Sequence, residues 1–258
     1  MKRPTPIIIP AKDEEENLSV LIPELQRELG DSIRIILAEN NSSDNTRSLA
    51  KKFNIEIVPP YKIGKLDALL GALRMLGDDA LEPFILMDGD TRPKNIKGWF
   101  IAMTRPLENS DRPMAITGRV LFTEPETNRI NLPWSGWRFI QALTRNIFFG
   151  RKSDRGPYLG PNQSLYIKSP KLLKGILDLP NNIWPMEECT IAWQFGPNGG
   201  RNKYLLAGDS VVYNPKTHKR IVGTTGGFSK EYQRELRNDI KWIDGLTFVR
   251  EHPKIYKK

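Results

Sequence analysis

Short apolar runs and segments of helical periodicity alternate over the first hundred residues, and this alternation restricts the fold more than any other feature of the sequence. Ile7-Ile8-Ile9 is typical of a buried strand, and the leucine and isoleucine side chains of 18–29 are spaced as on one face of a helix. Further strands are expected over 33–37, 55–58 and 84–87, and helices over 42–53, capped by Ser42, Ser43 or Asp44, and over 65–76. Strands that alternate with helices predict an α/β fold with a doubly wound, mostly parallel sheet.

The second part of the chain has a less regular pattern. Strands are expected over 115–122 and 160–167, a strand pair over 204–213, and helices over 134–149, 187–195 and 229–246. The sequence contains no clear linker and no internal repeat. We therefore expect a single domain over 1–258 with three parts, 1–110, 111–226 and 227–258, the last being a helix followed by a basic tail.

Composition and targeting signals exclude several classes of protein. One cysteine, Cys189, cannot form an internal disulfide, and one cysteine with two histidines cannot supply a Cys/His zinc site. The N-terminal apolar run is short and leads directly into Asp13, which is unlike an export signal. Because no run of 18 or more apolar residues is present, we expect no transmembrane segment, a cytoplasmic location, and only peripheral contact with any membrane.

Positive charge is concentrated in the second part of the chain. The formal net charge is +9, yet residues 1–100 hold 14 basic and 16 acidic side chains, whereas residues 101–258 hold 25 and 14. This asymmetry predicts an anionic partner for the second part, and a solvated basic face is the alternative.

Polar clusters follow four of the expected strands, at residues 12–16, 39–44, 62–65 and 88–90. Ligands of open parallel sheets bind outside the carboxyl ends of the strands, so we expect these clusters to meet at one crevice. The last cluster, Asp88-Gly89-Asp90, presents two carboxylates that can hold Mg²⁺ or Mn²⁺ while phosphate oxygens and water fill the other positions. An ordinary turn is the alternative for this tripeptide.

Four motifs accompany these clusters: residues 6–17 (PIIIPAKDEEEN), residues 35–46 (IILAENNSSDNT), Gly64-Lys65, and residues 86–93 (LMDGDTRP). In this order and spacing they resemble the nucleotide-sugar-binding half of the family 2 inverting glycosyltransferases, which have the GT-A fold. Two departures stand out. Lys12-Asp13 replaces the commoner Tyr-Asn, and Glu39-Asn40-Asn41 replaces Asp-Asp-Gly, so the resemblance leaves the donor base open.

The resemblance implies which residues form the donor site. By their positions in the motifs, the donor contacts are Pro10, Ala11, Glu15, Glu39, Lys65, Asp88, Gly89 and Asp90. Among them, Lys65 is expected near the diphosphate, and Asp90, helped by Asp88, is expected to ligate the metal. For Glu15 and Glu39, the alternative is a negative charge placed where a helix dipole favours it.

Beyond residue 110 the resemblance is thinner and implies acceptor and catalytic residues. Residues 160–168 are similar to a family stretch that borders the acceptor and the sugar, which makes Gly160 and Asn162 candidate acceptor contacts. Glu187-Glu188 resembles the Glu-Asp motif that supplies the base, with Glu188 at the Asp position. An inverting transfer needs such a carboxylate to take the proton of the acceptor hydroxyl. Two solvent-facing glutamates are the alternative.

Two basic regions of the second part add further candidates. His218 lies where related enzymes have a histidine that completes the metal site or touches the diphosphate, and a surface histidine is the alternative. Residues 134–155 combine aromatic with basic side chains, and Trp137 and Arg145 are candidate acceptor contacts. This stretch suits core packing, a helix on a membrane surface, or a nucleic-acid groove.

Together these features predict a metal-dependent glycosyltransferase that moves a sugar, with inversion, from a UDP- or GDP-linked donor to an acceptor hydroxyl. Residues 1–110 are expected to bind the donor and residues 111–226 the acceptor. The expected acceptor is anionic: a phosphorylated small molecule, a lipid phosphate, an acidic glycan or a hydroxymethylated DNA base. The alternatives are a non-catalytic nucleotide-sugar-binding module and a sugar nucleotidyltransferase, but the latter calls for a Gly-rich phosphate loop at residues 12–15.

Overall fold

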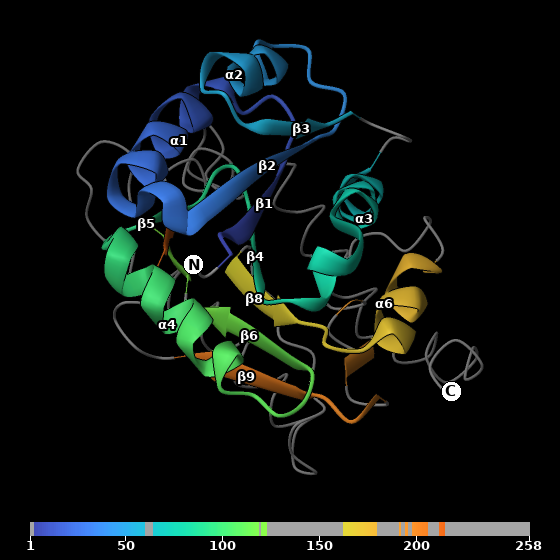
Figure 1. Ribbon diagram of the computed structural model, residues 1–258. Coiled ribbons are helices and arrows are strands. Elements are labelled where there is room, and N and C mark those ends of the chain that lie inside the picture. Colours follow the sequence, from blue (N-terminus) through green and yellow to red (C-terminus); the bar gives the residue numbers. More distant parts are fainter. Residues whose placement is uncertain are drawn as a thin grey trace, which may run out of the picture.

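The computed structural model describes residues 3–59, 64–118, 120–122, 162–179, 191, 194–195, 198–205 and 212–214. Their main sheet has seven strands in the order β3-β2-β1-β4-β8-β6-β9 (Figure 1). The strands are β1 (Thr5–Ala11), β2 (Ile33–Glu39), β3 (Glu56–Val58), β4 (Phe84–Met87), β6 (Met114–Gly118), β8 (Asn162–Tyr166) and β9 (Arg201–Leu205). Every neighbouring pair is parallel except the two that involve β8, which confirms the expected α/β fold.

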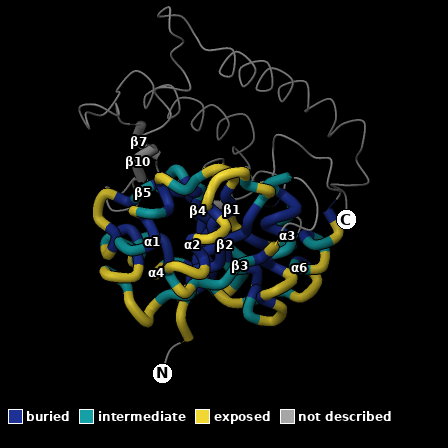
Figure 2. Tube along the Cα trace, turned by 90° about the horizontal axis from the view of Figure 1, so that it is seen from above, coloured by how far each residue is buried: buried dark blue, intermediate teal, exposed yellow. Residues whose placement is uncertain are grey.

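Helices cover both faces of the main sheet, with α1 and α4 on one face and α3 and α6 on the other (Figure 2). The helices are α1 (Glu15–Leu29), α2 (Thr46–Lys52), α3 (Lys65–Leu76), α4 (Ile96–Glu108) and α6 (Pro170–Leu177), and short 3₁₀ turns lie at η1 (Gly30–Ser32) and η2 (Gly77–Leu81). A small second sheet contains β5 (Arg92–Pro93), β10 (Val212–Asn214) and β7 (Val120–Phe122), in that order.

Strand β1 is apolar at successive positions because both faces of the main sheet are buried along it. Successive side chains of a strand point to opposite faces of the sheet. Ile7 and Ile9 therefore pack in the core on the side of α1 and α4, whereas Ile8 packs in the core on the side of α3 and α6. All three side chains are fully buried, and each burial contributes about 1.5–3 kcal/mol to stability.

Most elements of the first hundred residues agree with the sequence-based expectations. The strands expected over 7–9, 33–37, 55–58 and 84–87 and the helices over 18–29 and 65–76 are all present. The strand expected over 160–167 is present as β8. The helices expected over 134–149 and 229–246 lie outside the described residues, as does most of the helix expected over 187–195.

Two strand predictions are wrong in their pairing. The single strand expected over 115–122 is two strands, because β6 ends at Gly118 and pairs in the main sheet, whereas β7 begins at Val120 and pairs with β10 in the small sheet. The pair expected over 204–213 is also divided, since β9 belongs to the main sheet and β10 to the small one. Apolar content predicts a strand but does not specify its neighbour in the sheet.

Two helices, α4 and α6, are absent from the sequence-based expectations. Pro106 interrupts the pattern near the end of α4, yet the helix is held by fully buried side chains four residues apart: Trp99, Met103 and Leu107. The signal for α6 is the N-cap, because the hydroxyl of Ser169 accepts a hydrogen bond from the backbone of Leu172 and a proline follows at the first helical position.

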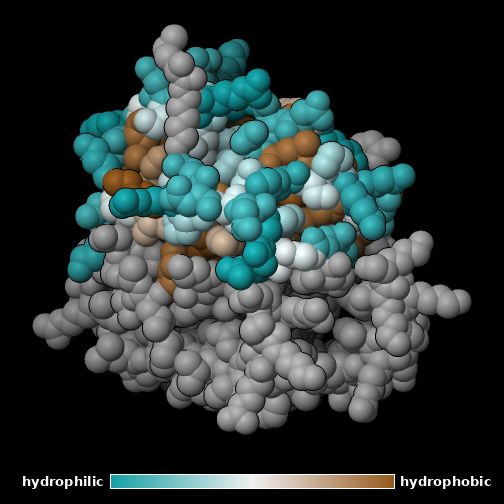
Figure 3. All heavy atoms as spheres, turned by 60° about the horizontal axis from the view of Figure 1, so that its bottom comes forward, coloured by the Kyte–Doolittle hydropathy of each residue, from teal (hydrophilic) through white to brown (hydrophobic). Residues whose placement is uncertain are grey.

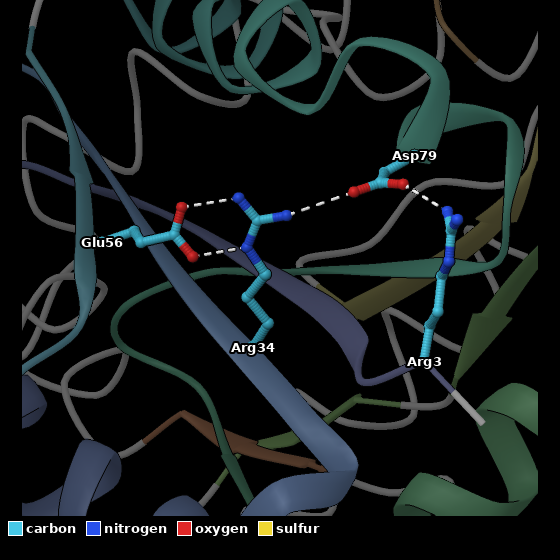
Figure 4. Close-up of polar contacts among 4 residues, drawn as sticks. All are labelled: Arg3, Arg34, Glu56 and Asp79. Atoms are coloured by element: carbon cyan, nitrogen blue, oxygen red, sulfur yellow. Dashed lines mark hydrogen bonds and ion pairs between the residues drawn. The ribbon is translucent and has the colours of Figure 1, made fainter. Parts of the chain in front are cut away.

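A network of ion pairs joins neighbouring strands at the amino edge of the sheet (Figure 4). The guanidinium of Arg34 donates to both carboxylate oxygens of Glu56, with an Nη2–Oε2 distance of 2.6 Å, while Asp79 accepts from Arg3 at 2.8 Å and from Arg34 at 3.4 Å. The hydrogen bonds between Arg34 and Glu56 raise the pKa of Arg34 and lower the pKa of Glu56. Because these side chains are partly exposed, each pair contributes about 0.2–1 kcal/mol.

The described surface carries only scattered hydrophobic side chains. The large exposed ones are Val20, Met75 and Ile101, which lie on three different helices. On the face seen in Figure 3, hydrophobic residues form separate small patches between hydrophilic ones. Isolated apolar residues of this kind are ordinary on protein surfaces. No helix within the described ranges has both the length and the apolar character that crossing a membrane requires.

Candidate functional site

The carboxyl ends of β1, β2 and β4 lie side by side and bring the expected polar clusters together. β1 lies between the other two strands, with Ala11 opposite Glu39 on β2 and Ile8 opposite Leu86 on β4. The chain leaves each of these ends in a polar loop, and helix α3 begins beside them at Lys65. Three of the four clusters, and Lys65 of the fourth, therefore meet at one edge of the sheet, as predicted.

An ion pair lies where β4 ends. The ammonium of Lys65, the first residue of α3, is 2.7 Å from Oδ1 of Asp88, and both side chains are 27% exposed. Asp90 follows two residues later, and its Oδ1 is 3.4 Å from the hydroxyl of Thr91. A cation and two carboxylates are thus grouped at the strand end, accessible to a ligand.

Gly89 allows the turn after β4 to pack against the end of β1. A Cβ at this position would lie 3.2 Å from Cγ of Glu14 and 3.6 Å from Cβ of Ala11. Pro10, Ala11 and Gly89 are all buried. A side chain at 89 would therefore push against the loop that follows β1, and the contact of these three residues with a donor stays a prediction.

The loops after β1 and β2 are held together by hydrogen bonds. Asp13 accepts from the backbone and the hydroxyl of Ser43, at 2.6 and 2.9 Å, and its own backbone donates to the hydroxyl of Ser42 at 3.1 Å. These bonds from Ser43 lower the pKa of Asp13. Neither serine therefore caps helix α2 as expected. The expected cap at Asp44 is not formed either: its Oδ1 accepts from the backbone of Thr46 at 2.9 Å, but Asn45 is the N-cap residue of α2 and its side chain makes no capping hydrogen bond.

The two glutamates predicted as donor contacts are both engaged within these loops. The carboxylate of Glu15 accepts from the backbone and the side-chain amide of Asn45 at 3.0–3.1 Å. Glu39 is 2% exposed, and its Oε1 accepts from the backbone of Ser42 at 2.5 Å. Glu15 also lies in the first turn of α1, where a negative charge is favoured. In this structure both side chains hold loops in place, and their contact with a base or ribose stays a prediction.

Asn162 lies at the same edge of the sheet but points into the core. It stands opposite Met87, the residue before Asp88, and it is completely buried. Its Oδ1 accepts a hydrogen bond from Nε1 of Trp99 at 3.0 Å. That contact is structural, and the predicted contact of Asn162 with an acceptor stays a prediction. Trp99 was missed from the sequence because a buried indole needs a partner whose identity only the fold reveals.

The remaining predicted residues lie outside the described part of the chain. They are Trp137, Arg145, Gly160, Glu187, Glu188 and His218. The described part contains no group of three or more His, Cys, Asp or Glu side chains arranged to hold a metal ion. Asp88 and Asp90, after β4, carry carboxylate oxygens, which are the kind of ligand that Mg²⁺ and Mn²⁺ prefer.

A cleft of about 450 Å³ opens at the opposite edge of the sheet, far along the strands from Asp88. Its charged lining consists of Arg3, Arg34, Asp79, Glu82 and Glu108, and Tyr166 also lines it. Ligand sites of open α/β sheets lie at the carboxyl ends of strands, and this cleft lies at the amino ends. Its position separates it from the grouped residues of the candidate site.

Solved structures share this fold. Glucosyl-3-phosphoglycerate synthase from Mycobacterium tuberculosis, in complex with phosphoglyceric acid, is 17% identical with a TM-score of 0.53, and the match covers 79% of this chain and 70% of that one. The same synthase in complex with Mn²⁺ and UDP-glucose is also 17% identical with a TM-score of 0.53, and the match covers 79% of this chain and 69% of that one. A mycobacterial protein gives 18% and 0.53, with coverages of 82% and 65%. At such identities the likeness establishes the GT-A fold.

Sequence comparison identifies the family. No curated protein sequence matches the chain. The family described as glycosyl transferase family 2 matches residues 7–160, which is more than half of the chain and includes Ala11, Glu39, Lys65 and Asp88. The chain therefore belongs to glycosyl transferase family 2 and is a nucleotide-sugar-dependent glycosyltransferase.

Proposed function

We propose that this enzyme transfers a sugar from a UDP-sugar to a hydroxyl of a small phosphorylated acceptor, with inversion at the anomeric carbon and with a divalent cation. The observation that carries the donor side is the ion pair of Lys65 with Asp88, next to Asp90, at the carboxyl ends of the strands. A diphosphate leaving group develops negative charge, and preorganised cations at that place stabilise the transition state.

Lys65 and the turn after β4 suit a diphosphate in a specific way. The ammonium of Lys65 is 2.7 Å from Oδ1 of Asp88. A bound diphosphate offers Lys65 several charged oxygens, and charge-assisted hydrogen bonds are about twice as strong as neutral ones. We expect Lys65 to turn to the phosphate oxygens and the carboxylate of Asp88 to contact the cation.

The donor set fits a divalent cation. Asp88 and Asp90 are both partly exposed and supply carboxylate oxygens, which leaves several coordination positions for diphosphate oxygens and water. A divalent cation at these carboxylates would offset the charge of the leaving diphosphate. Glucosyl-3-phosphoglycerate synthase, a structural neighbour, was solved with Mn²⁺, UDP and UDP-glucose, which supports uracil as the donor base and Mn²⁺ as a suitable ion.

The acceptor proposal has two supports. Residues 101–258 hold 25 basic and 14 acidic side chains, which favours an anionic acceptor. Glucosyl-3-phosphoglycerate synthase, a structural neighbour, was solved with phosphoglyceric acid and with glycerol 3-phosphate. A phosphorylated three-carbon compound therefore represents the acceptor class best. Glu188 is the proposed base that takes the proton of the acceptor hydroxyl, with Glu187 beside it.

Transfer by the purified chain tests the proposal. UDP-glucose, MnCl₂ and either 3-phosphoglycerate or glycerol 3-phosphate are incubated with the protein, and released UDP and glycosylated product are quantified by mass spectrometry. We expect transfer that stops in excess chelator, and proton NMR of the product is expected to show the α-anomeric bond of UDP-glucose converted to β. Retention of the α configuration would contradict the inverting mechanism.

A matched pair of variants isolates the metal site. Asp90→Asn keeps the size of the side chain but removes the charge, so turnover should be lost while the fold is kept. Asp31→Asn makes the same change in the exposed turn η1, at the start of β2 and away from the site, and should leave turnover unchanged. Full activity of Asp90→Asn would contradict the proposed metal site. Release of UDP without a glycosylated product would contradict the proposed acceptor class.

A further inference from the structure

Asn40 connects three of the segments that meet at the candidate site. It is the first residue after β2, and its backbone N–H donates to the carbonyl of Ala11 at the end of β1, at 2.9 Å. Its side-chain Oδ1 accepts a hydrogen bond from the backbone N–H of Gly64, also at 2.9 Å. Asn40 therefore ties the ends of β1 and β2 to the residue that immediately precedes Lys65.

Gly64 is the position through which this tether acts. It is the N-cap of α3 and has a φ of 144°, which side-chain-bearing residues rarely adopt. Its carbonyl accepts from the backbone of Ala68 at 3.2 Å, so Gly64 also closes the first turn of the helix. The hydrogen bond to the N–H of Gly64 thus fixes the position at which α3 begins, and with it the backbone position of Lys65, the first residue of the helix.

We infer that Asn40 is a positioning residue that places Lys65 for the diphosphate of the donor. The inference rests on the proposed function, since it assumes that Lys65 binds the diphosphate. Lys65 has a long side chain that loses considerable rotamer freedom when it is held. Asn40, through Gly64, fixes the backbone from which the Lys65 side chain extends. Less conformational entropy is then lost when Lys65 binds the diphosphate, and preorganisation of this kind strengthens binding.

Binding measurements with two ligands test this role. Asn40→Ala removes the acceptor for Gly64, and we expect the affinity for UDP in the presence of MnCl₂ to fall about 3- to 10-fold, as for the loss of one hydrogen bond. The affinity for uridine, which has no phosphate, should stay as in the wild type. UDP is measured by calorimetry and uridine by ligand-observed NMR. A general disturbance of the loops would weaken both ligands together.

Two further variants complete the design. Asn40→Asp keeps an oxygen that accepts from the N–H of Gly64 but adds a negative charge that opposes the diphosphate, so it should restore part of the UDP affinity that Asn40→Ala loses. Ser169→Ala removes a comparable bond from a side-chain oxygen to a backbone N–H at the start of α6, near the opposite edge of the sheet, and should leave both affinities unchanged. Circular dichroism and thermal unfolding confirm that each variant is folded.

The outcomes separate the tether from the proposed function. Wild-type protein that binds neither UDP nor UDP-glucose would overturn the proposed donor site and the tether with it. Wild-type protein that binds UDP, together with Asn40→Ala that binds it equally well, would overturn the tether alone. Equal loss of UDP and uridine by Asn40→Ala would also overturn it, because Asn40 would then support the whole pocket.

Discussion

Replacing Asn162 by alanine distinguishes the structural contact of this residue from its predicted contact with an acceptor. Asn162 is completely buried at the start of β8, and its Oδ1 accepts from Nε1 of Trp99, which is also completely buried. The substitution removes that acceptor and leaves a space beside Met87, the last residue of β4.

The expected loss of stability is large because both partners of the hydrogen bond, Asn162 and Trp99, are buried. A buried donor that loses its acceptor costs about 1–3 kcal/mol, and the space left by the shortened side chain adds about 1 kcal/mol. We expect Asn162→Ala to lower the free energy of unfolding by about 2–4 kcal/mol. For a chain of this size, the melting temperature should then fall by about 5–15 °C.

Urea unfolding of four proteins measures the contact itself. Trp99→Phe keeps an aromatic ring in the core but lacks the N–H donor, so the wild type, the two single variants and the double variant form a thermodynamic cycle. A coupling energy of about 0.5–3 kcal/mol between the two positions is expected for residues in direct contact. The cycle removes whatever each substitution does through its other neighbours.

The result that would refute this reasoning is a specific one. If Asn162→Ala unfolds at the same urea concentration as the wild type but raises the KM for the acceptor, the side chain serves the acceptor and the contact with Trp99 contributes nothing measurable. Additive effects of Asn162→Ala and Trp99→Phe would likewise contradict a direct hydrogen bond between them.

Four further changes have definite expected outcomes. Lys65→Met should weaken UDP binding about 10- to 100-fold by calorimetry, because a charge-assisted contact with the diphosphate is lost. Gly200→Ala should lower the free energy of unfolding by about 1–3 kcal/mol in urea, since its Cβ would lie 2.9 Å from two backbone oxygens. Arg34 lowers the pKa of Glu56 below its ordinary 4.5. The pairing therefore stabilises the fold fully above pH 4.5, and this stabilisation is lost as the pH falls through the lowered pKa. In acid unfolding, Glu56→Gln should lack the loss of stability that comes from protonation of Glu56. Glu188→Gln should lower kcat about 100-fold or more with little change in donor affinity, and an unaffected kcat would contradict its role as the base.

The candidate site was predictable from sequence to the extent that it depends on strand ends. Lys65, Asp88 and Gly89 lie at or close to the end of a helix or strand that the local hydrophobic periodicity predicts. Their convergence therefore follows from the expectation of a parallel sheet. Asn40 is different, because the sequence shows it as part of a polar cluster and as a departure from the family pattern, but does not reveal its partner. Its bond to Gly64 spans 24 residues and depends on how two loops are placed relative to each other.

The sequence by itself determined the α/β class, the order of the first strands and helices, and the positions of the polar clusters, since these depend on interactions within one element. The tertiary structure alone decided which partner each side chain meets. Ser43 bonds Asp13 instead of capping its own helix, and Asn162 turns from the site toward Trp99. It also assigned residues 114–118 and 120–122 to different sheets. Periodicity records which face of an element is buried, whereas hydrogen bonds and strand pairing depend on the groups that folding brings alongside it.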